Sequence, residues 1–217
     1  MNRLFLIAII FLFANNCSAQ QWTAQEFESA NTAKDIQLLT DEEKEVVRYI
    51  NLARLYPKKF ASIELKKAIE DGLYKETEFT KSLQVTLNQM KPVGLLSFDQ
   101  TMYQLANCFA IESGKSGSYG HHRVHCVDGY DAECCSYGTY DYIGRYVAIQ
   151  LLIDEGVPSL GHRKACLDKS MEKVGLNIQP HASYDYCCVL DFKGEETIYK
   201  SKKTKRSLRS KLGDIFR

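Results

Sequence analysis

An α+β fold is predicted by the order of the patterned segments in this 217-residue chain. Segments with helical periodicity come first, and a further one covers residues 143–156. Residues 114–144 are rich in Gly, Ser, Tyr, His and Cys, which indicates long loops. Two segments with strand character, VGLNIQ and YDYCCVLDF, end the patterned region as a predicted antiparallel hairpin. Because helices precede strands instead of alternating with them, α+β is favoured over repeated βαβ units.

Four helices are expected before the loop region, over residues 40–56, 58–70, 78–90 and 97–113. Thr40 with Glu43, and Ser97 with Gln100, each form a capping-box pattern at a helix start. We expect Gly114 to end the last of these helices, because glycine readily adopts the left-handed conformation of a helix C-cap.

The first twenty residues have the character of a secretory signal peptide. Arg3 precedes an apolar run from Leu4 to Ala14. Cys17-Ser18-Ala19 then offers small residues at the two positions that a signal peptidase recognises. The run is too short to span a membrane, so we expect cleavage after Ala19 and a secreted chain. Lipid attachment at Cys17 is the alternative, which the large Asn16 before it disfavours.

The remainder divides into a leader or loosely packed helix over 20–39, a domain over 40–193 and a basic tail over 194–217. Residues 200–217 carry eight basic side chains against one acid, a net charge of +7, so the rest of the chain sums to −6. The tail is either a contact for an anionic membrane or envelope polymer, or a solvated segment. The acidic remainder has no nucleic-acid signature.

Seven cysteines follow the signal peptide, and disulfides are expected in an exported chain; they are Cys108, Cys126, Cys134, Cys135, Cys166, Cys187 and Cys188. An odd number leaves at least one free thiol or an intermolecular bridge. No CxxC pair occurs, so a zinc site built from cysteines is not expected. Cys187 and Cys188 should face opposite sides of their strand, because side chains alternate along a strand.

One acid stands in an unfavourable position. Asp154 ends the helix predicted over 143–156, where the helix dipole is negative and a carboxylate costs about 0.3–1 kcal/mol. Gly156 is the expected C-cap, and Pro158 directs a short connection to His162. We therefore expect a histidine or a metal ion to face Asp154.

With these residues the sequence resembles the CAP superfamily, which comprises cysteine-rich secretory proteins, venom antigens and plant pathogenesis-related proteins. EVVRYINLARLYPKKFA is similar to its opening helix, and VGLNI with YCCVLDF to its closing strands. GSYGHHR supplies His121 at the first cavity histidine, and AECCSYG supplies Glu133 at the first acid. YVAIQLLIDEGVPSLGHR supplies Asp154 and His162 at the second acid and the second histidine. The resemblance covers residues 41–192.

The resemblance implies a three-layer α-β-α sandwich with a central cavity, lined by these four side chains, that in some members holds a divalent cation, often zinc. Two neutral imidazoles and water would ligate the ion, with the carboxylates of Glu133 and Asp154 in the outer shell. Because only two protein side chains would ligate the ion, we expect its binding to be weak and sensitive to pH. Cys134 replaces the usual asparagine after the first acid, and Asp154 is one methylene shorter than glutamate, with Glu155 as the alternative second acid.

Three classes of function remain open. The first is a binding module that receives a divalent cation and a small or apolar ligand or a cell-surface partner. The second is a metal-assisted hydrolase, a peptidase or esterase, with Glu133 or Asp154 as general base. The third is a structural protein in which His–acid bridges only hold the loops together.

Two further interpretations concern single features. Cys166, four residues after His162, is either a nucleophile beside an imidazole or, with more support, half of a disulfide. GxSxG and HExxH are absent from the sequence. A tyrosine-rich loop is either a carbohydrate or peptide platform or ordinary loop packing; its members are Tyr130, Tyr137, Tyr140 and Tyr142.

Overall fold

The computed structural model describes residues 21–194. The predicted signal peptide and nearly all of the basic tail lie outside this range. Within it, no helix is both long and apolar enough to cross a membrane.

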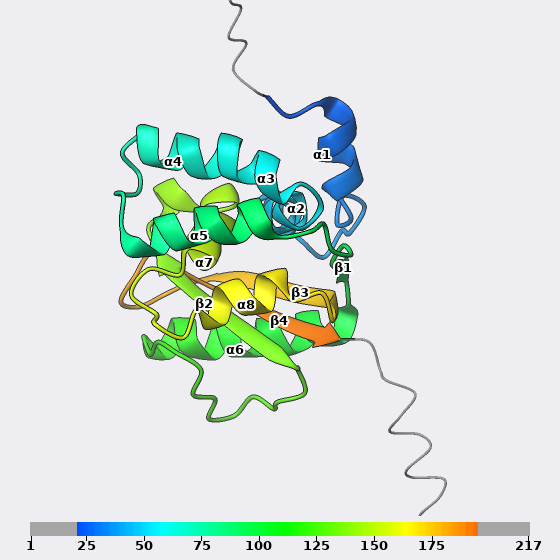
Figure 1. Cartoon of the computed structure of the whole chain (residues 1–217). Coiled ribbons are helices and arrows are strands. Elements are labelled where there is room, and N and C mark those ends of the chain that lie inside the picture. The colour runs from blue at the N-terminus through cyan, green and yellow to red at the C-terminus, as the bar shows by residue number, and fades with distance from the viewer. Residues whose placement is uncertain (1–20, 195–217) are drawn as a thin grey trace, which may run out of the picture.

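Helices and a single mixed sheet make up the fold, which confirms the α+β class (Figure 1). The elements are α1 (Ala24–Ala30), α2 (Asp41–Leu55), α3 (Pro57–Phe60), the π-helical η1 (Ala61–Leu65), α4 (Lys66–Glu70), α5 (Glu78–Gln89), β1 (Ser97–Phe98), α6 (Gln100–Ser116), β2 (Ala132–Gly138), the 3-10 turn η2 (Tyr140–Tyr142), α7 (Arg145–Ile153), α8 (Gly161–Leu167), β3 (Met171–Pro180) and β4 (Tyr186–Gly194).

The sheet has the strand order β1-β3-β4-β2, so β2 is an edge strand. β1 pairs with β3 in parallel, whereas β3–β4 and β4–β2 are antiparallel. α6 covers one face of the sheet, and α2, α7 and α8 pack against the other (Figure 1). The predicted closing hairpin is confirmed as β3 and β4.

Alternation along β4 assigns each side chain to one of two cores. Cys188 and Leu190 belong to the larger core beneath α2, α7 and α8. Cys187 and Val189 belong to the smaller core beneath α6. The prediction that the two adjacent cysteines face opposite sides is therefore confirmed. Asp191 follows Cys187 and Val189 in the same phase, so its carboxylate is buried on the α6 face.

Close approach of α6 to the sheet requires a glycine. A Cβ on Gly175 of β3 would lie 1.8 Å from the backbone nitrogen of Tyr103 and 2.3 Å from the carbonyl carbon of Met102. Both atoms belong to the α6 backbone and cannot rotate away. The bare Cα of Gly175 thus sets the spacing between this helix and the sheet.

Helix starts follow the sequence in one case and depart from it in another. Thr40 accepts the N–H of Glu43, whose carboxylate accepts the N–H of Thr40, so the first capping box is confirmed. The second is wrong, because Asp99 caps α6 by accepting the N–H of Met102. α6 also runs past Gly114 to Ser116, and its C-cap is Gly117, which has the left-handed φ of 68°.

Residues 132–138 form β2, although the sequence predicts a loop there. All seven pair with β4, so a partner distant in the sequence stabilises a segment of mixed composition. The segment predicted as a leader contains α1, which packs on α2. Its residues Ala30, Ala33 and Leu39 are buried in the larger core.

Cysteine pairing is sparser than predicted. Cys108 and Cys126 form a disulfide that ties the loop before β2 to α6. Among the described residues, five buried thiols are free: Cys134, Cys135, Cys166, Cys187 and Cys188. Contrary to the expectation, Cys166 is not disulfide-bonded in this structure, and apolar packing buries its thiol completely.

Candidate functional site

Asp154 is the C-cap of α7, and it also caps the start of α8. Its backbone is left-handed, with φ 59° and ψ 42°, a conformation that short polar side chains such as Asp tolerate. The predicted role of Gly156 as C-cap is therefore wrong. The fully buried carboxylate accepts the backbone N–H of His162 at 3.0 Å and of Arg163 at 3.2 Å. The positive end of the α8 dipole thus stabilises this carboxylate, which the negative end of the α7 dipole disfavours.

The predicted histidine does face Asp154, and an arginine also covers the negative end of α7. The buried guanidinium of Arg163 donates to the carbonyl oxygens of Leu152 and Ile153 at 2.7 Å each. It also donates to the hydroxyl of Ser82 and the carbonyl of Phe79 on α5. α8 is therefore fixed to two neighbouring helices one residue after its histidine.

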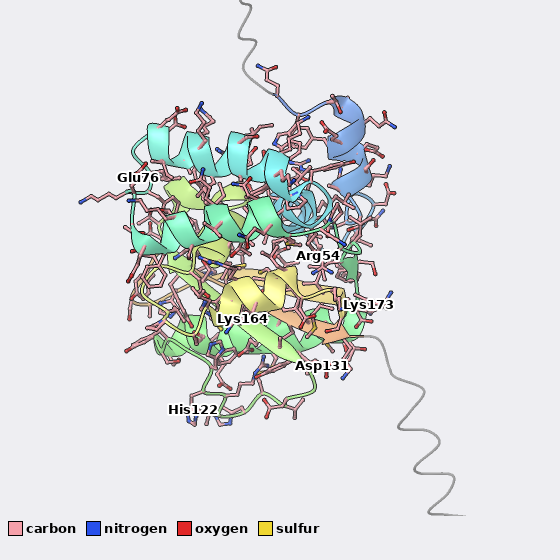
Figure 2. The ribbon with its side chains drawn as sticks, viewed as in Figure 1. Arg54, Glu76, His122, Asp131, Lys164 and Lys173 are labelled. Atoms are coloured by element: carbon pink, nitrogen blue, oxygen red, sulfur yellow. A yellow bond between two sulfur atoms is a disulfide. The ribbon has the colours of Figure 1, made fainter. Side chains whose placement is uncertain are left out.

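The far end of α8 is held by a second buried arginine. Arg54 of α2 donates to the carbonyl oxygens of Gly94, Cys166, Asp168 and Met171 at 2.6–2.9 Å (labelled in Figure 2). These contacts join the end of α8 to the start of β3. His162 therefore lies on a helix that is anchored at both ends.

The first histidine–acid pair is His162 with Asp154. Nδ1 of His162 lies 2.7 Å from Oδ1 of Asp154, and the histidine side chain is 19% exposed. The second pair is His121 with Glu133, in which Nδ1 lies 2.9 Å from Oε1. Here the carboxylate is buried, whereas the His121 side chain is 51% exposed.

The structure brings the two pairs together. The imidazole centroids of His121 and His162 are 5.9 Å apart, with 35° between the ring planes. Glu133 lies on edge strand β2, next to Cys134, whose sulfur donates to the carbonyl of His162 at 3.7 Å. The four predicted site residues thus lie around the open edge of the sheet. In each pair the carboxylate fixes Nδ1, which leaves Nε2 as the nitrogen available to a ligand.

The loop that carries His121 is held by its own contacts. Glu112 of α6 accepts the backbone N–H groups of Val124, His125 and Cys126 at 2.6–3.3 Å. Burial acts to raise the pKa of the Glu112 carboxyl, but these three bonds outweigh it and lower that pKa. The Cys108–Cys126 disulfide closes the same loop.

Beneath the second pair lies a buried arginine that the sequence analysis missed. Arg123 lies between the rings of Phe109 and Tyr130, 4.6 and 4.7 Å from their centroids. Its guanidinium donates to Glu133 and, at 3.0 Å, to Asp191. The strand alternation that marks Asp191 as a buried acid was the available signal, since such a group needs a cation.

Glu133 and Asp191 are direct cross-strand neighbours, so two carboxylates share one arginine. Burial raises the pKa of Asp191 to about 8, with Glu133 adding to the rise and Arg123 opposing it. Burial also acts to raise the pKa of Glu133, but hydrogen bonds from His121 and Arg123 outweigh it and lower that pKa. A protonated Asp191 beside an ionised Glu133 leaves the cluster electrically neutral.

A third residue extends the possible donor set. His121, Glu133 and Cys135 each offer a ligand atom, and these atoms all lie within 4.8 Å of one another. Cys135 is buried, however, and burial together with Glu133 and Asp191 raises the pKa of its thiol well above the usual value. The thiolate that binds metal is therefore disfavoured at this position.

Other candidates from the sequence lie elsewhere. Glu155 is exposed and accepts the hydroxyl of Thr77 at 2.7 Å, whereas Asp154 is the acid paired with His162. His122 is exposed on the loop below the sheet (Figure 2). Cys166 is too deeply buried to meet a substrate as a nucleophile. Tyr137 donates to the carbonyl of Gly120 and accepts its N–H, which indicates loop packing.

No family model and no curated protein matches this chain. Among solved structures, the chain is similar to an outer surface protein from Borrelia burgdorferi, with 18% sequence identity and a TM-score of 0.37. That alignment covers 62% of this chain and 96% of the other.

Proposed function

We propose that this chain is an exported CAP-like binding protein whose histidine pair weakly binds a divalent cation, most suitably zinc. The observation that carries the proposal is the facing arrangement of the His121–Glu133 and His162–Asp154 pairs, 5.9 Å apart between ring centroids. Helices on both faces of the sheet agree with the α-β-α sandwich that the family resemblance implies.

The residues present fit a zinc ion. With Zn–N distances of about 2.1 Å and tetrahedral angles, two imidazole centroids around one ion stand roughly 5 Å apart. The observed spacing needs only a small movement of the more exposed ring, His121. Both histidines already have the carboxylate partner on the second nitrogen that orients a metal-binding imidazole and increases its basicity. The bound ion would act as a Lewis acid toward a ligand.

Binding is favoured over hydrolysis by the state of the carboxylates. Both oxygens of Asp154 are occupied, one by the His162 ring and the other by two backbone N–H groups. Both oxygens of Glu133 are occupied as well, by His121 and by Arg123. A general base has to take a proton from water, and in both acids each oxygen is already shared with a hydrogen-bond donor, which makes it a poorer base.

The ligand class is proposed from the surface beside His121. Tyr119, Val124 and Val127 are 78%, 66% and 70% exposed in the same loop. Large apolar side chains held outward by a disulfide-closed loop suit a small or apolar ligand or a cell-surface partner. Export is supported by the disulfide, since such bonds persist in oxidising compartments.

Calorimetric titration with zinc tests the proposal. The His121→Ala/His162→Ala double variant should lose at least about tenfold in affinity, because both protein ligands are removed. His122→Ala/His125→Ala, which removes two exposed histidines of the same loop, should match the unaltered chain. Equal affinity in all three proteins would refute the site. Cys135→Ser separates the two donor sets, because only a site that uses the thiol loses affinity in that variant.

The hydrolase alternative has its own measurement. Zinc-dependent turnover of a peptide or ester library that Glu133→Gln abolishes would replace the binding proposal. Zinc binding without turnover would support it.

A further inference from the structure

Two of the five free thiols of the described residues lie between the elements that carry the histidine pair. Cys134 follows Glu133 on β2, and Cys166 stands one helical turn after His162 on α8. Both side chains are completely buried, in the core on the same face of the sheet. α8 packs directly on β2, and the Cys134 sulfur lies 3.7 Å from the carbonyl oxygen of His162, one helical turn before Cys166.

The thiols are in contact. The side chains of Cys134 and Cys166 share a hydrogen bond, and burial, with this bond adding to it, raises the pKa of Cys134 well above its usual value. The Cys134 sulfur also reaches the carbonyl of His162 on the first turn of α8. By contrast, Cys187 contacts the carbonyl of Ala110 on α6, beneath the opposite face of the sheet.

From this juxtaposition we propose that Cys134 and Cys166 are a disulfide-forming pair that links β2 to α8 in the oxidised chain. Both cysteines are free in the structure. The cross-link would join the strand that bears Glu133 to the helix that bears His162, and so fix the distance between the two histidine–acid pairs. The inference concerns the cysteines alone and does not depend on whether zinc binds.

The chemistry is thiol–disulfide exchange with a disulfide oxidant, either an oxidase of the exporting compartment or a small-molecule disulfide. One protein thiolate attacks the oxidant to form a mixed disulfide and releases one thiol. The second protein thiolate then displaces the remaining half. The protein loses two protons and two electrons and gains one S–S bond, while the oxidant is reduced to two thiols. Exchange has to precede the packing of α8, because both sulfurs are buried afterwards.

Peptide mapping tests the pairing in the full chain folded with a glutathione redox couple. After the free thiols are alkylated in denaturant, trypsin releases residues 124–145, which carry Cys126, Cys134 and Cys135, and the pentapeptide ACLDK, which carries Cys166. We expect residues 124–145 to be joined both to the peptide of Cys108 and to ACLDK. The link to ACLDK should persist in Cys135→Ala and disappear in Cys134→Ala.

The Cys108–Cys126 link is the internal control for oxidation. If it forms while ACLDK is recovered fully alkylated, or if ACLDK is joined to any other cysteine, the proposal is wrong. The link between ACLDK and residues 124–145 is mapped on the unaltered chain, so only the choice among the three cysteines of that peptide depends on variants.

Thermal melting gives a second readout. A link across residues 134–166 should raise the melting temperature by about 10 °C over the reduced pair. Reductant should therefore lower the melting temperature of the unaltered chain and of Cys188→Ala by about that much more than it lowers that of Cys166→Ala. Cys188 is the matched control, since its thiol is equally buried in the same core. An equal effect of reductant on all three proteins would overturn the proposal.

Discussion

Replacing Asp154 by asparagine isolates the charge that holds α8 and His162 in place. Asparagine has the same shape and also tolerates the left-handed backbone at this position. Its single carbonyl oxygen can still accept the N–H groups of His162 and Arg163. What is lost is the ionised partner of the His162 ring and the negative charge at the start of α8.

The expected loss of stability follows from these two contributions. A hydrogen bond to a charged group contributes about 1.5–3 kcal/mol. A carboxylate at a helix N-terminus adds about 0.3–1 kcal/mol. Asp154→Asn should therefore reduce the free energy of unfolding by about 2–4 kcal/mol.

Equilibrium denaturation in urea measures this loss, with Glu155→Gln as the matched control. Glu155 is the adjacent acid, exposed and outside the pair, so its substitution should change stability by less than about 0.5 kcal/mol. The same Asp154 variant should weaken zinc binding by about 10–100-fold, because the partner that orients His162 is changed. If Asp154→Asn is as stable as Glu155→Gln, the carboxylate does not organise α8 and the reasoning fails.

Three further predictions concern the buried arginine cluster and the packing of α6. Arg123→Met should cost about 3–5 kcal/mol in urea denaturation, because it leaves the buried, ionised Glu133 without its cation; a loss below about 1 kcal/mol would contradict the cluster. Burial raises the pKa of Asp191 to about 8 in the folded chain, compared with about 3.9 in the unfolded chain. Protonation of Asp191 therefore stabilises the fold fully below about pH 4, and this stabilisation decreases as the pH rises toward about 8. The stability of Asp191→Asn relative to the unaltered chain should therefore increase over that pH range, and a constant difference would refute the assignment of the proton. Gly175→Ala should lower stability by about 3 kcal/mol or more, because its Cβ would collide with the backbone of Tyr103, while Gly94→Ala, which meets nothing within 4 Å, serves as the control.

Local signals in the sequence predicted the elements that local interactions determine. The capping box at Thr40 and the alternation that separates Cys187 from Cys188 each depend on residues within a few positions of one another. The order of segments was likewise sufficient for the α+β class. β2 was missed because its residues become a strand only by pairing with β4, which lies far away in the sequence.

The candidate site was likewise predicted only in part. The resemblance singled out four residues that the structure brings together as two pairs, but it gave no account of what supports them. Arg123 and Asp191 were not predicted as part of the site, because their contact depends on cross-strand register and on a loop that folds back over α6. The disulfide could not be assigned, since seven cysteines allow many pairings and spacing alone does not choose among them.

The two histidines are fixed by different means, and this difference bears on how a cation would bind. His162 is the second residue of α8, and its backbone N–H donates to Asp154. The next residue, Arg163, donates hydrogen bonds to α7 and α5. The position of His162 is therefore set by backbone. His121 lies in a loop closed by a disulfide and by Glu112, and its ring is held through the Glu133 carboxylate. With 51% of its side chain exposed against 19% for His162, His121 is the ring with room to move. A cation would thus meet His162 as a preformed ligand, and the free energy needed to position His121 would limit the affinity.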